Sequence, residues 1–331
     1  MRATVKDVAT RAGVSPKTVS NVISGDIFVR PETRERVVEA LRELDYVPNL
    51  SARGLRTGRS GIIALALPAL ATAYSAEMVH HFVEAAHARG WGVQIEETAS
   101  RPEREDELLS RARSHLVDGL ILNPINLAES ALARSSELPP AVLIGEVEQT
   151  LIDQIRVDSV AAAEEMTAYL VERGAREIAV LGEMPIATAQ ARSEGYRRAL
   201  RTAGLALDPS LAIACSDWTP AGGARAVTEF LRGRRSVPDA LFCFTDGMAL
   251  GALSALASAG IRVPQDTLVA GFDDIEVSAY SVPALTTIGF DKHAFAEAAL
   301  DRLGARIADR TSPPQTVIIP HALIERASTG A

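Results

Sequence analysis

Lys17 and Asn21 are the first pair of side chains whose types and spacing suit a chemical task. Residues four apart on a helix share one face. Lysine can donate to guanine O6 and N7, and asparagine can pair with N6 and N7 of adenine. Thr18 and Ser20 can donate to phosphate oxygens, as can the backbone N–H groups at the start of the helix. The segment therefore predicts a helix that reads the major groove of double-stranded DNA.

Residues 1–46 have the pattern of three short helices that would hold this reading helix in place. Apolar residues at helical spacing end at Gly13, where the first helix breaks. Ser15 is a good N-cap and Pro16 is tolerated at the first helical position, so the second helix begins there. A third helix is expected at about 31–44. Two short helices joined by a tight turn with glycine indicate a helix-turn-helix, although a protein-binding module of three helices has the same pattern.

The charges are divided unevenly along the 331 residues. Residues 1–60 hold 11 of the 34 Lys and Arg and 7 of the 42 Asp and Glu, so this segment is +4 and the remainder is −12. A basic head on an acidic body indicates a polyanionic partner at one end of the chain only.

From Gly61 onward, short apolar runs alternate with helical stretches, beginning with 61–67 (GIIALAL) and ending with 316–319 (TVII). Continuous apolar strands that alternate with helices predict an α/β fold with parallel sheets covered on both faces. The series is long for one sheet, so two stacked α/β subdomains with a cleft between them are the natural alternative. Ligands bind at the carboxyl ends of the strands in such folds.

Several other classes of protein are disfavoured. No apolar run reaches the ~20 residues that a membrane span needs, and the opening run MRATVKDVATRAG lacks the apolar region of a secretory signal. Cys215 and Cys243 lie in apolar runs, as buried free thiols in a reducing cytoplasm would. No phosphate-binding or nucleophile motif is present, and His80, His81 and His87 match no zinc spacing. The sequence predicts a cytoplasmic protein that is not an enzyme, with no catalytic residue, metal or cofactor.

Residues 4–56 resemble the DNA-binding head and hinge of the LacI/GalR family of repressors. The matching runs are TVKDVATRAGVSPKTVSNVISG and VRPETRERVVEALRELDYVPNLSARGLR. The resemblance implies a helix-turn-helix head, a hinge, and a periplasmic-binding-protein-like body of two doubly wound parallel-sheet subdomains. The expected boundaries are 1–48 for the head, 49–60 for the hinge helix and linker, and 61–331 for the effector-binding and dimerisation body. Within the body, the N-subdomain is expected at about 61–158 and 290–318, and the C-subdomain at about 159–289 and 319–331.

The hinge is expected to be a conditional helix. Asn49 can cap it, but a helix of about eight residues is marginal in water. Gly54, where many relatives have a larger residue, weakens it by about 1 kcal/mol. We therefore expect the hinge to form only against DNA and a partner hinge. The resemblance implies that paired hinges enter the minor groove, with Leu55 as an apolar wedge and Arg53 and Arg56 at phosphates or groove edges. An inter-domain contact is the alternative for Leu55.

Two heads imply a homodimer and a near-palindromic operator in double-stranded DNA. The body must supply the dimer contact, because the heads are too small to do so. The residues expected to contact DNA are Ser15, Pro16, Lys17, Thr18, Ser20, Asn21, Asn49, Arg53, Leu55 and Arg56.

A second set of residues matches the positions that contact a ligand in this family. They are Tyr74, Ser75, Asp158, Thr188, Arg192, Trp218, Thr245, Asp246 and Asp273. Their carboxylates and guanidinium suit hydroxyl groups, and Trp218 offers a flat apolar face for a sugar ring. The carboxylates would repel an anion, so the expected effector is a neutral sugar or related polyol. Ser75, where relatives often have a bulky residue, indicates a roomier or more polar pocket.

These residues also have structural alternatives. The aspartates precede expected helices and can be N-caps. Arg192 can pair with Glu194 on the surface, and Trp218 can belong to the core. The leading hypothesis is a transcriptional repressor in which effector binding changes the closure of the subdomains and so alters operator affinity. A solute-binding protein without a DNA role and an α/β enzyme with a DNA-binding head are the alternatives.

Overall fold

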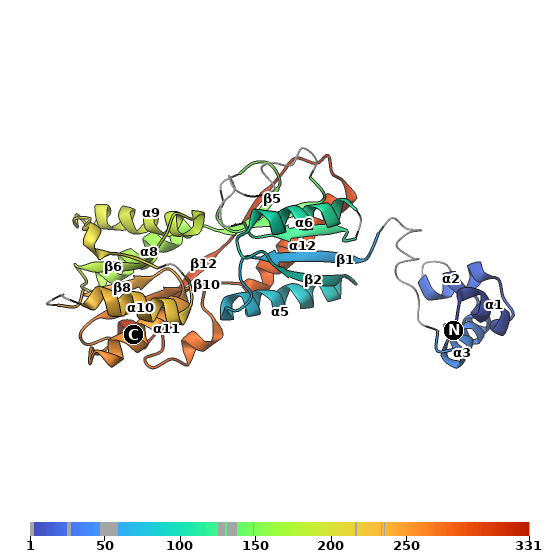
Figure 1. Cartoon of the computed structure of the whole chain (residues 1–331), viewed down its shortest axis with the longest axis horizontal. Helices are drawn as coiled ribbons and strands as arrows, with labels where there is room; N and C mark the ends of the chain where they lie inside the picture. The colour runs from blue at the N-terminus through green and yellow to red at the C-terminus, as the bar shows by residue number, and fades with distance from the viewer. Residues whose placement is uncertain are drawn as a thin grey trace. The chain divides into compact units, whose positions relative to one another are not determined.

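The computed structural model describes residues 3–24, 28–46, 59–114, 116–124, 130, 138–147, 149–215, 217–232, 234 and 236–330. The chain forms two compact units, residues 1–60 and 61–331, and each has its own hydrophobic core (Figure 1). Among the described residues, no helix is long and apolar enough to cross a membrane.

The described residues of the first unit form three helices: α1 Val5–Ala12, α2 Pro16–Ser24 and α3 Pro31–Glu43. A capping box begins α1, because the Thr4 hydroxyl accepts from the Asp7 N–H and the Asp7 carboxylate accepts from the Thr4 N–H. Gly13 then adopts the left-handed conformation, with φ of 66°, that ends α1 and starts the turn into α2. Apolar residues from all three helices meet in the core of this unit. They are Val8, Ala9, Ala12, Val19, Val22, Val37 and Ala40.

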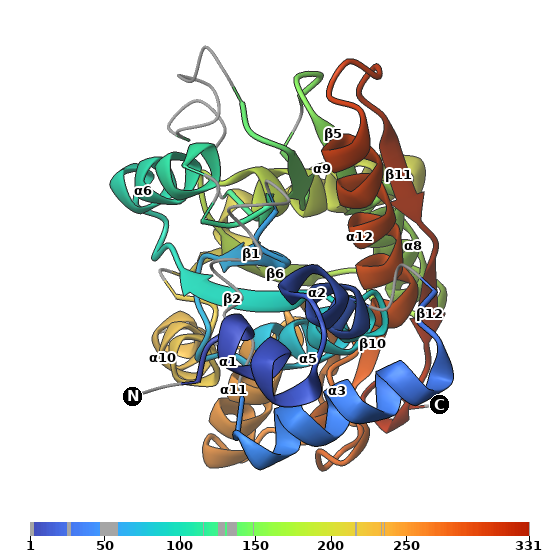
Figure 2. The ribbon, with the colours of Figure 1, turned by 90° about the vertical axis from the view of Figure 1, so that its right-hand side faces the viewer.

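The first subdomain of the body is built on a six-stranded sheet in the order β11-β5-β4-β3-β1-β2, with every pair of neighbours parallel. Its strands are β1 Ile62–Leu67, β2 Gly92–Glu97, β3 Gly119–Leu122, β4 Ala141–Ile144, β5 Asp153–Val157 and β11 Thr316–Ile319. Helices α5 Ala73–Ala88 and α12 Lys292–Ala308 pack on one face, and α6 Pro102–Arg113 packs on the other. Figure 2 shows α6 and α12 well separated, on different sides of the strands of this sheet.

The second subdomain has a six-stranded sheet in the order β12-β10-β9-β8-β6-β7. Its strands are β6 Ile178–Glu183, β7 Ala212–Ala214, β8 Ala240–Cys243, β9 Leu268–Phe272, β10 Thr286–Phe290 and β12 His321–Ile324. Its helices are α8 Ser159–Glu172, α9 Ala187–Thr202, α10 Pro220–Leu231 and α11 Asp246–Ser258, with short 3-10 turns η1 Pro209–Leu211, η2 Glu276–Ala279 and η3 Ala327–Thr329. Figure 1 shows the pair α8 and α9 and the pair α10 and α11 on opposite sides of this sheet.

Close helix packing fixes the position of α9, which carries one of the candidate cleft residues. Gly195 lies where a Cβ atom would collide with the Val160 carbonyl oxygen of α8. Glycine therefore lets the two helices approach, and the buried Tyr196 hydroxyl donates to the Ile178 carbonyl of β6 at 2.8 Å. These contacts hold α9 against α8 and the first residue of β6.

The two subdomains are joined by three passages of the chain, from β5 to α8, from β10 to α12 and from β11 to β12. The predicted α/β fold with two parallel-sheet subdomains is confirmed. The sequence did not reveal β12, which pairs antiparallel with β10 at the edge of the second sheet.

Candidate functional site

Helix α2 presents the residues expected to contact DNA. Val19 and Val22 are buried, whereas Lys17 is exposed and Ser20 and Asn21 are half-buried. The burial pattern therefore turns the predicted reading face outward from the core of the first unit. Pro16 is the exposed first residue of the helix, as predicted for a proline at that position.

Ser15 and Thr18 begin α2 together. The Ser15 hydroxyl accepts from the Thr18 N–H at 3.1 Å, and the two side-chain oxygens lie 2.9 Å apart. This is the N-cap arrangement expected from the sequence. The remaining residues expected to contact DNA, Asn49, Arg53, Leu55 and Arg56, lie outside the described residues.

Arg192 lies at the centre of the cleft candidates. Its side chain is buried, with the residue 6% exposed, and its guanidinium carbon lies 3.5 Å from the centre of the Phe272 ring and 5.9 Å from that of Trp218. One terminal nitrogen donates to the Phe244 carbonyl oxygen. The other is 3.5 Å from the Asp273 carboxylate, a long contact for an ion pair. Arg192 therefore binds the protein through only part of its guanidinium.

Two buried donors in this region have no acceptor among the described residues. They are Nε of Arg192 and Nε1 of Trp218. Leaving a buried donor unsatisfied is unfavourable by about 1–3 kcal/mol, and native proteins rarely do so. Because these donors lie on side chains already close to each other, the arrangement suits a ligand that supplies oxygen acceptors.

Acidic and phenolic groups from the first subdomain face this arginine. Burial, followed by the charge of Asp273, raises the pKa of Tyr74, and the charge of Arg192 opposes the rise. Burial also raises the pKa of Glu146, which accepts from the Ser159 hydroxyl at 2.9 Å and interacts electrostatically with Arg192 and Asp158. Electrostatic interactions thus connect Tyr74 and Glu146 with residues of the other subdomain.

Glu146 was not predicted from the sequence. It follows β4 directly after Gly145, at the carboxyl end of the strand, and an acidic residue at that place is the signal that could have found it. Its ion-pair partner is Arg156 of the neighbouring strand β5, with a nitrogen 3.4 Å from the carboxylate.

Asp273 is held in an unusual backbone conformation. Its φ is 111°, and that of the next residue, Asp274, is 45°. Positive φ is uncommon for residues other than glycine and is found most often at functional sites. Burial raises the pKa of Asp273 to about 6, although the charges of Arg192 and Lys292 oppose the rise. The expectation that Asp273 is an N-cap is not supported by any hydrogen bond from its side chain to a helix, since η2 has Ile275 at its start.

Asp246 has a different environment from Asp273. Its carboxylate accepts from the Ile275 N–H at 3.0 Å, the Ser278 hydroxyl at 2.7 Å and the Thr287 hydroxyl at 2.6 Å. Burial raises the pKa of Asp246 to about 7 in spite of these donors. Asp246 therefore anchors the loop after β9, and Thr245 rather than Asp246 is the N-cap of α11, accepting from the Met248 N–H at 3.2 Å.

The remaining candidates lie at helix starts. Asp158 is the N-cap of α8, accepting from the Ala161 N–H at 3.1 Å. Ser75 is buried and is bonded to Thr72, the N-cap of α5. Thr188 is half-buried in the first turn of α9. The structure thus groups Tyr74, Arg192, Trp218 and Asp273, with Glu146 and Asp158 beside them, and uses the hydroxyl of Ser75 within a helix cap.

Metal binding has no support in this region. No group of three His, Cys, Asp or Glu side chains in the described part of the chain is placed to hold a metal ion. Both cysteines are buried free thiols, and burial raises the pKa of each.

Comparison with known proteins matches both units. Residues 4–49 match the model of bacterial regulatory proteins of the lacI family, and residues 167–329 match that of a periplasmic binding protein-like domain. The chain is 34% identical over 331 residues to the HTH-type transcriptional repressor PurR of Klebsiella pneumoniae, covering 98% of this chain and 96% of the relative. It is 33% identical to the PurR repressor of Histophilus somni, covering 98% of each.

Solved structures agree with this relationship. The Lac repressor dimer bound to operator and the anti-inducer ONPF aligns with a TM-score of 0.87 at 29% identity, covering 100% of both chains. The complex of the transcriptional regulator CelR with cellobiose aligns with a TM-score of 0.71 at 29% identity, covering 99% of this chain and 100% of that one. The expected resemblance is therefore confirmed: the chain belongs to the lacI family of bacterial regulatory proteins and is a DNA-binding transcriptional repressor, not an enzyme.

Proposed function

We propose that the operator affinity of this repressor is controlled by a neutral sugar or related polyol that binds between the two subdomains of the body. The observation that carries this proposal is the pair of buried donors, Arg192 Nε and Trp218 Nε1, that find no acceptor in the described part of the chain and lie beside the weakly paired Asp273. A hydroxyl group both accepts and donates, so one polyol can satisfy the donors and the carboxylate together.

The charges around Arg192 favour a neutral ligand. Asp273 and Glu146 both interact electrostatically with the buried Arg192, and a ligand carboxylate or phosphate would be repelled by these two acids. The ring of Trp218 offers a flat face for a sugar ring. Cellobiose in the related CelR complex is a precedent for a sugar in this family.

Operator recognition is proposed for α2, with Lys17 and Asn21 at base edges and Ser15, Pro16, Thr18 and Ser20 near the phosphate backbone. The hinge is proposed to enter the minor groove with Leu55 as its wedge, capped by Asn49, while Arg53 and Arg56 reach phosphates or groove edges. Such a protein functions where the chromosome is, so we assign it to the cytoplasm.

A homodimer is proposed because the body exposes a group of apolar residues on and after η2. Val277, Tyr280 and Val282 are 48%, 78% and 94% exposed. Clustered apolar exposure of this kind is typical of protein interfaces. The related Lac repressor binds its operator as a dimer. Two copies would place two heads on a near-palindromic operator.

A carbohydrate panel tested by thermal shift on the full-length protein would identify the effector. We expect Arg192→Ala and Asp273→Ala to weaken its binding by about tenfold or more, because each removes a charged hydrogen-bonding partner. Arg198→Ala is the matched control, since Arg198 lies on the same helix in an exposed pair with Glu194. The control should leave binding unchanged.

Operator binding should respond to the opposite set of substitutions. Lys17→Ala and Asn21→Ala are expected to weaken sequence-selective binding in a gel shift and to leave the thermal shift with carbohydrate intact. Effector binding should change operator affinity by a coupling free energy of about 1–3 kcal/mol. Parallel loss of both activities in every variant would contradict this division of roles.

A further inference from the structure

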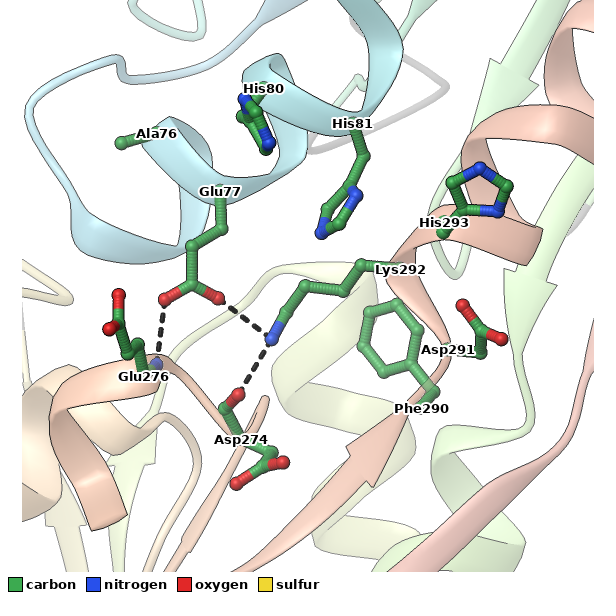
Figure 3. Close-up of a pocket in the computed structure, with 10 residues that line it drawn as sticks. All are labelled: Ala76, Glu77, His80, His81, Asp274, Glu276, Phe290, Asp291, Lys292 and His293. Carbon is green, nitrogen blue, oxygen red and sulfur yellow. Dashed lines mark hydrogen bonds and ion pairs between the residues drawn. The ribbon is translucent and has the colours of Figure 1, made fainter. Parts of the chain in front are cut away.

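Glu77 and Lys292 form an ion pair close to the cleft and contact the loop that follows β9 (Figure 3). The Lys292 ammonium lies 2.8 Å from the Glu77 carboxylate and donates to the Asp274 carbonyl oxygen at 2.7 Å. The other Glu77 oxygen accepts from the Glu276 N–H at 2.7 Å. The carboxylate and the ammonium thus bind each other and also the backbone of one short loop.

These contacts cross from one subdomain to the other. Glu77 on α5 and Lys292 on α12 belong to helices that pack on the first sheet, whereas Asp274 and Glu276 follow β9 of the second. The same loop has anchors within its own subdomain, because Asp246 accepts from the Ile275 N–H and Arg326 donates to the Asp274 carboxylate. The loop belongs to the second subdomain, and the ion pair therefore connects it to the first.

The loop also determines where Asp273 points. Asp273 and Asp274 both have positive φ, a conformation that persists only where surrounding contacts stabilise it. The ammonium of Lys292 bonds the carbonyl oxygen of the second of these residues. Its positive charge also lowers the pKa of Asp273 against the effect of burial. Lys292 thus contributes to both the geometry and the charge of the carboxylate that faces Arg192.

We propose that Glu77 and Lys292 form a latch that holds the two subdomains together and positions Asp273 in the cleft. Its regulatory consequence rests on the proposed function, because an effector bound to Asp273 would stabilise or strain the loop that the latch holds. The latch is then one route by which cleft occupancy changes the contact between the two subdomains, beside the direct contacts of a ligand with each of them. Lys292 is a positioning residue and contacts no ligand in this scheme.

The surroundings of the latch allow it to open. Lys292 is only 9% exposed. If its ion pair with Glu77 broke while the side chain stayed in place, the ammonium would therefore be poorly hydrated. A hollow of about 590 Å³ lies beside the ion pair, lined by residues that include His80, His81 and His293. This space gives the lysine side chain room to move towards solvent when the pair separates.

Acrylamide quenching of Trp218 fluorescence tests the latch without any ligand or DNA. Trp91 and Trp218 are the only tryptophans, so Trp91→Phe in the full-length protein leaves the cleft tryptophan as the single probe. In this background, Lys292→Met should at least double the quenching constant, because the subdomains separate more often. Lys292→Arg should restore it nearly to the parent value. Arg262→Gln, which breaks an exposed pair elsewhere, should leave it unchanged.

Hydrogen exchange at the loop gives a second, independent measurement. Glu77→Ala should accelerate exchange of the Glu276 amide by tenfold or more, since that N–H loses its acceptor. Glu77→Gln, which keeps an oxygen acceptor but no charge, should accelerate it less and still raise Trp218 quenching. If Lys292→Met does not fold, the two Glu77 variants decide the question. Parent-like quenching and exchange in folded variants would overturn the latch, whatever the outcome of the operator and carbohydrate experiments.

Discussion

The body buries aspartate and arginine together in two regions, and the two regions use them differently. Asp153, at the start of β5, accepts from Arg302 at 3.0 Å, from two nitrogens of Arg306 at 2.9 and 2.7 Å, and from the Gln315 N–H at 2.9 Å. Asp273, in the cleft, has one contact with Arg192 at 3.5 Å. The first carboxylate is saturated with donors, whereas the second has capacity left for a ligand.

This difference separates structural ion pairs from binding groups. Asp153 and its donors, Arg302, Arg306 and the Gln315 N–H, form what we call the Asp153 cluster. It connects the end of α12 to β5 and to the segment before β11, so its hydrogen bonds stabilise the first subdomain. One donor there, Arg302 Nε, also has no partner within the described ranges, but the two terminal nitrogens of Arg302 are bound. In the cleft, the unsatisfied groups include both Arg192 and Trp218, and they lie beside a weakly paired acid. We therefore use incomplete pairing that recurs on neighbouring side chains as the argument for the proposed effector site.

The largest effect is expected from Asp153→Asn, which keeps the size of the side chain but removes its charge. Two arginines would then lack their buried counter-charge, and breaking such a cluster destabilises by about 3–5 kcal/mol. The measurement is the free energy of unfolding in urea at pH 7. A loss below about 1 kcal/mol would show that the cluster is no more important for stability than an exposed pair.

Asp246→Asn should change how stability depends on pH. Burial raises the pKa of Asp246 to about 7, so the folded protein holds its proton at a pH where the unfolded chain has already lost it. The protonated form thus contributes stability that is lost as the pH rises from about 4 towards 7. At about 1.4 kcal/mol per pH unit, over the two units between pH 5 and the folded pKa, the free energy of unfolding should fall about 3 kcal/mol more between pH 5 and 8 in the parent than in the variant. Parallel pH profiles would show that Asp246 is ionised throughout.

Sequence reasoning found the helix-turn-helix and the α/β fold, because helix caps, apolar periodicity and a family motif are local patterns, and it proposed a set of cleft residues. It gave Asp158, Asp246 and Asp273 the same structural alternative, an N-cap, since each precedes an expected helix, and it favoured a structural role only for Asp246. The structure separates them: Asp158 is an N-cap, Asp246 anchors a loop and Asp273 lies in a loop with positive φ. Their hydrogen-bonding partners are distant in sequence, so no spacing could have distinguished them. The interaction of Glu146 with Arg192 across the subdomains was missed for the same reason.

Asp273→Asn should have a smaller effect on stability than either previous substitution. The carboxylate has one long ion contact and is buried, so the charge that it loses was poorly stabilised in the folded state. We expect the free energy of unfolding at pH 7 to change by less than about 1 kcal/mol, while affinity for the effector falls. A loss as large as that of Asp153→Asn would remove the distinction between the two regions.

Arg262→Gln is expected to have the smallest effect, although its ion pair has the better geometry. Arg262 and Asp266 are joined by two side-chain contacts of 2.9 and 2.6 Å, both shorter than the contact between Arg192 and Asp273. The pair lowers the pKa of Asp266 to about 2, but both groups are hydrated when they separate. We therefore expect no resolvable change in the urea midpoint at pH 7. A clear decrease would mean that distance, rather than burial and saturation, ranks the ion pairs of this protein, and the contrast between Asp153 and Asp273 would need another explanation.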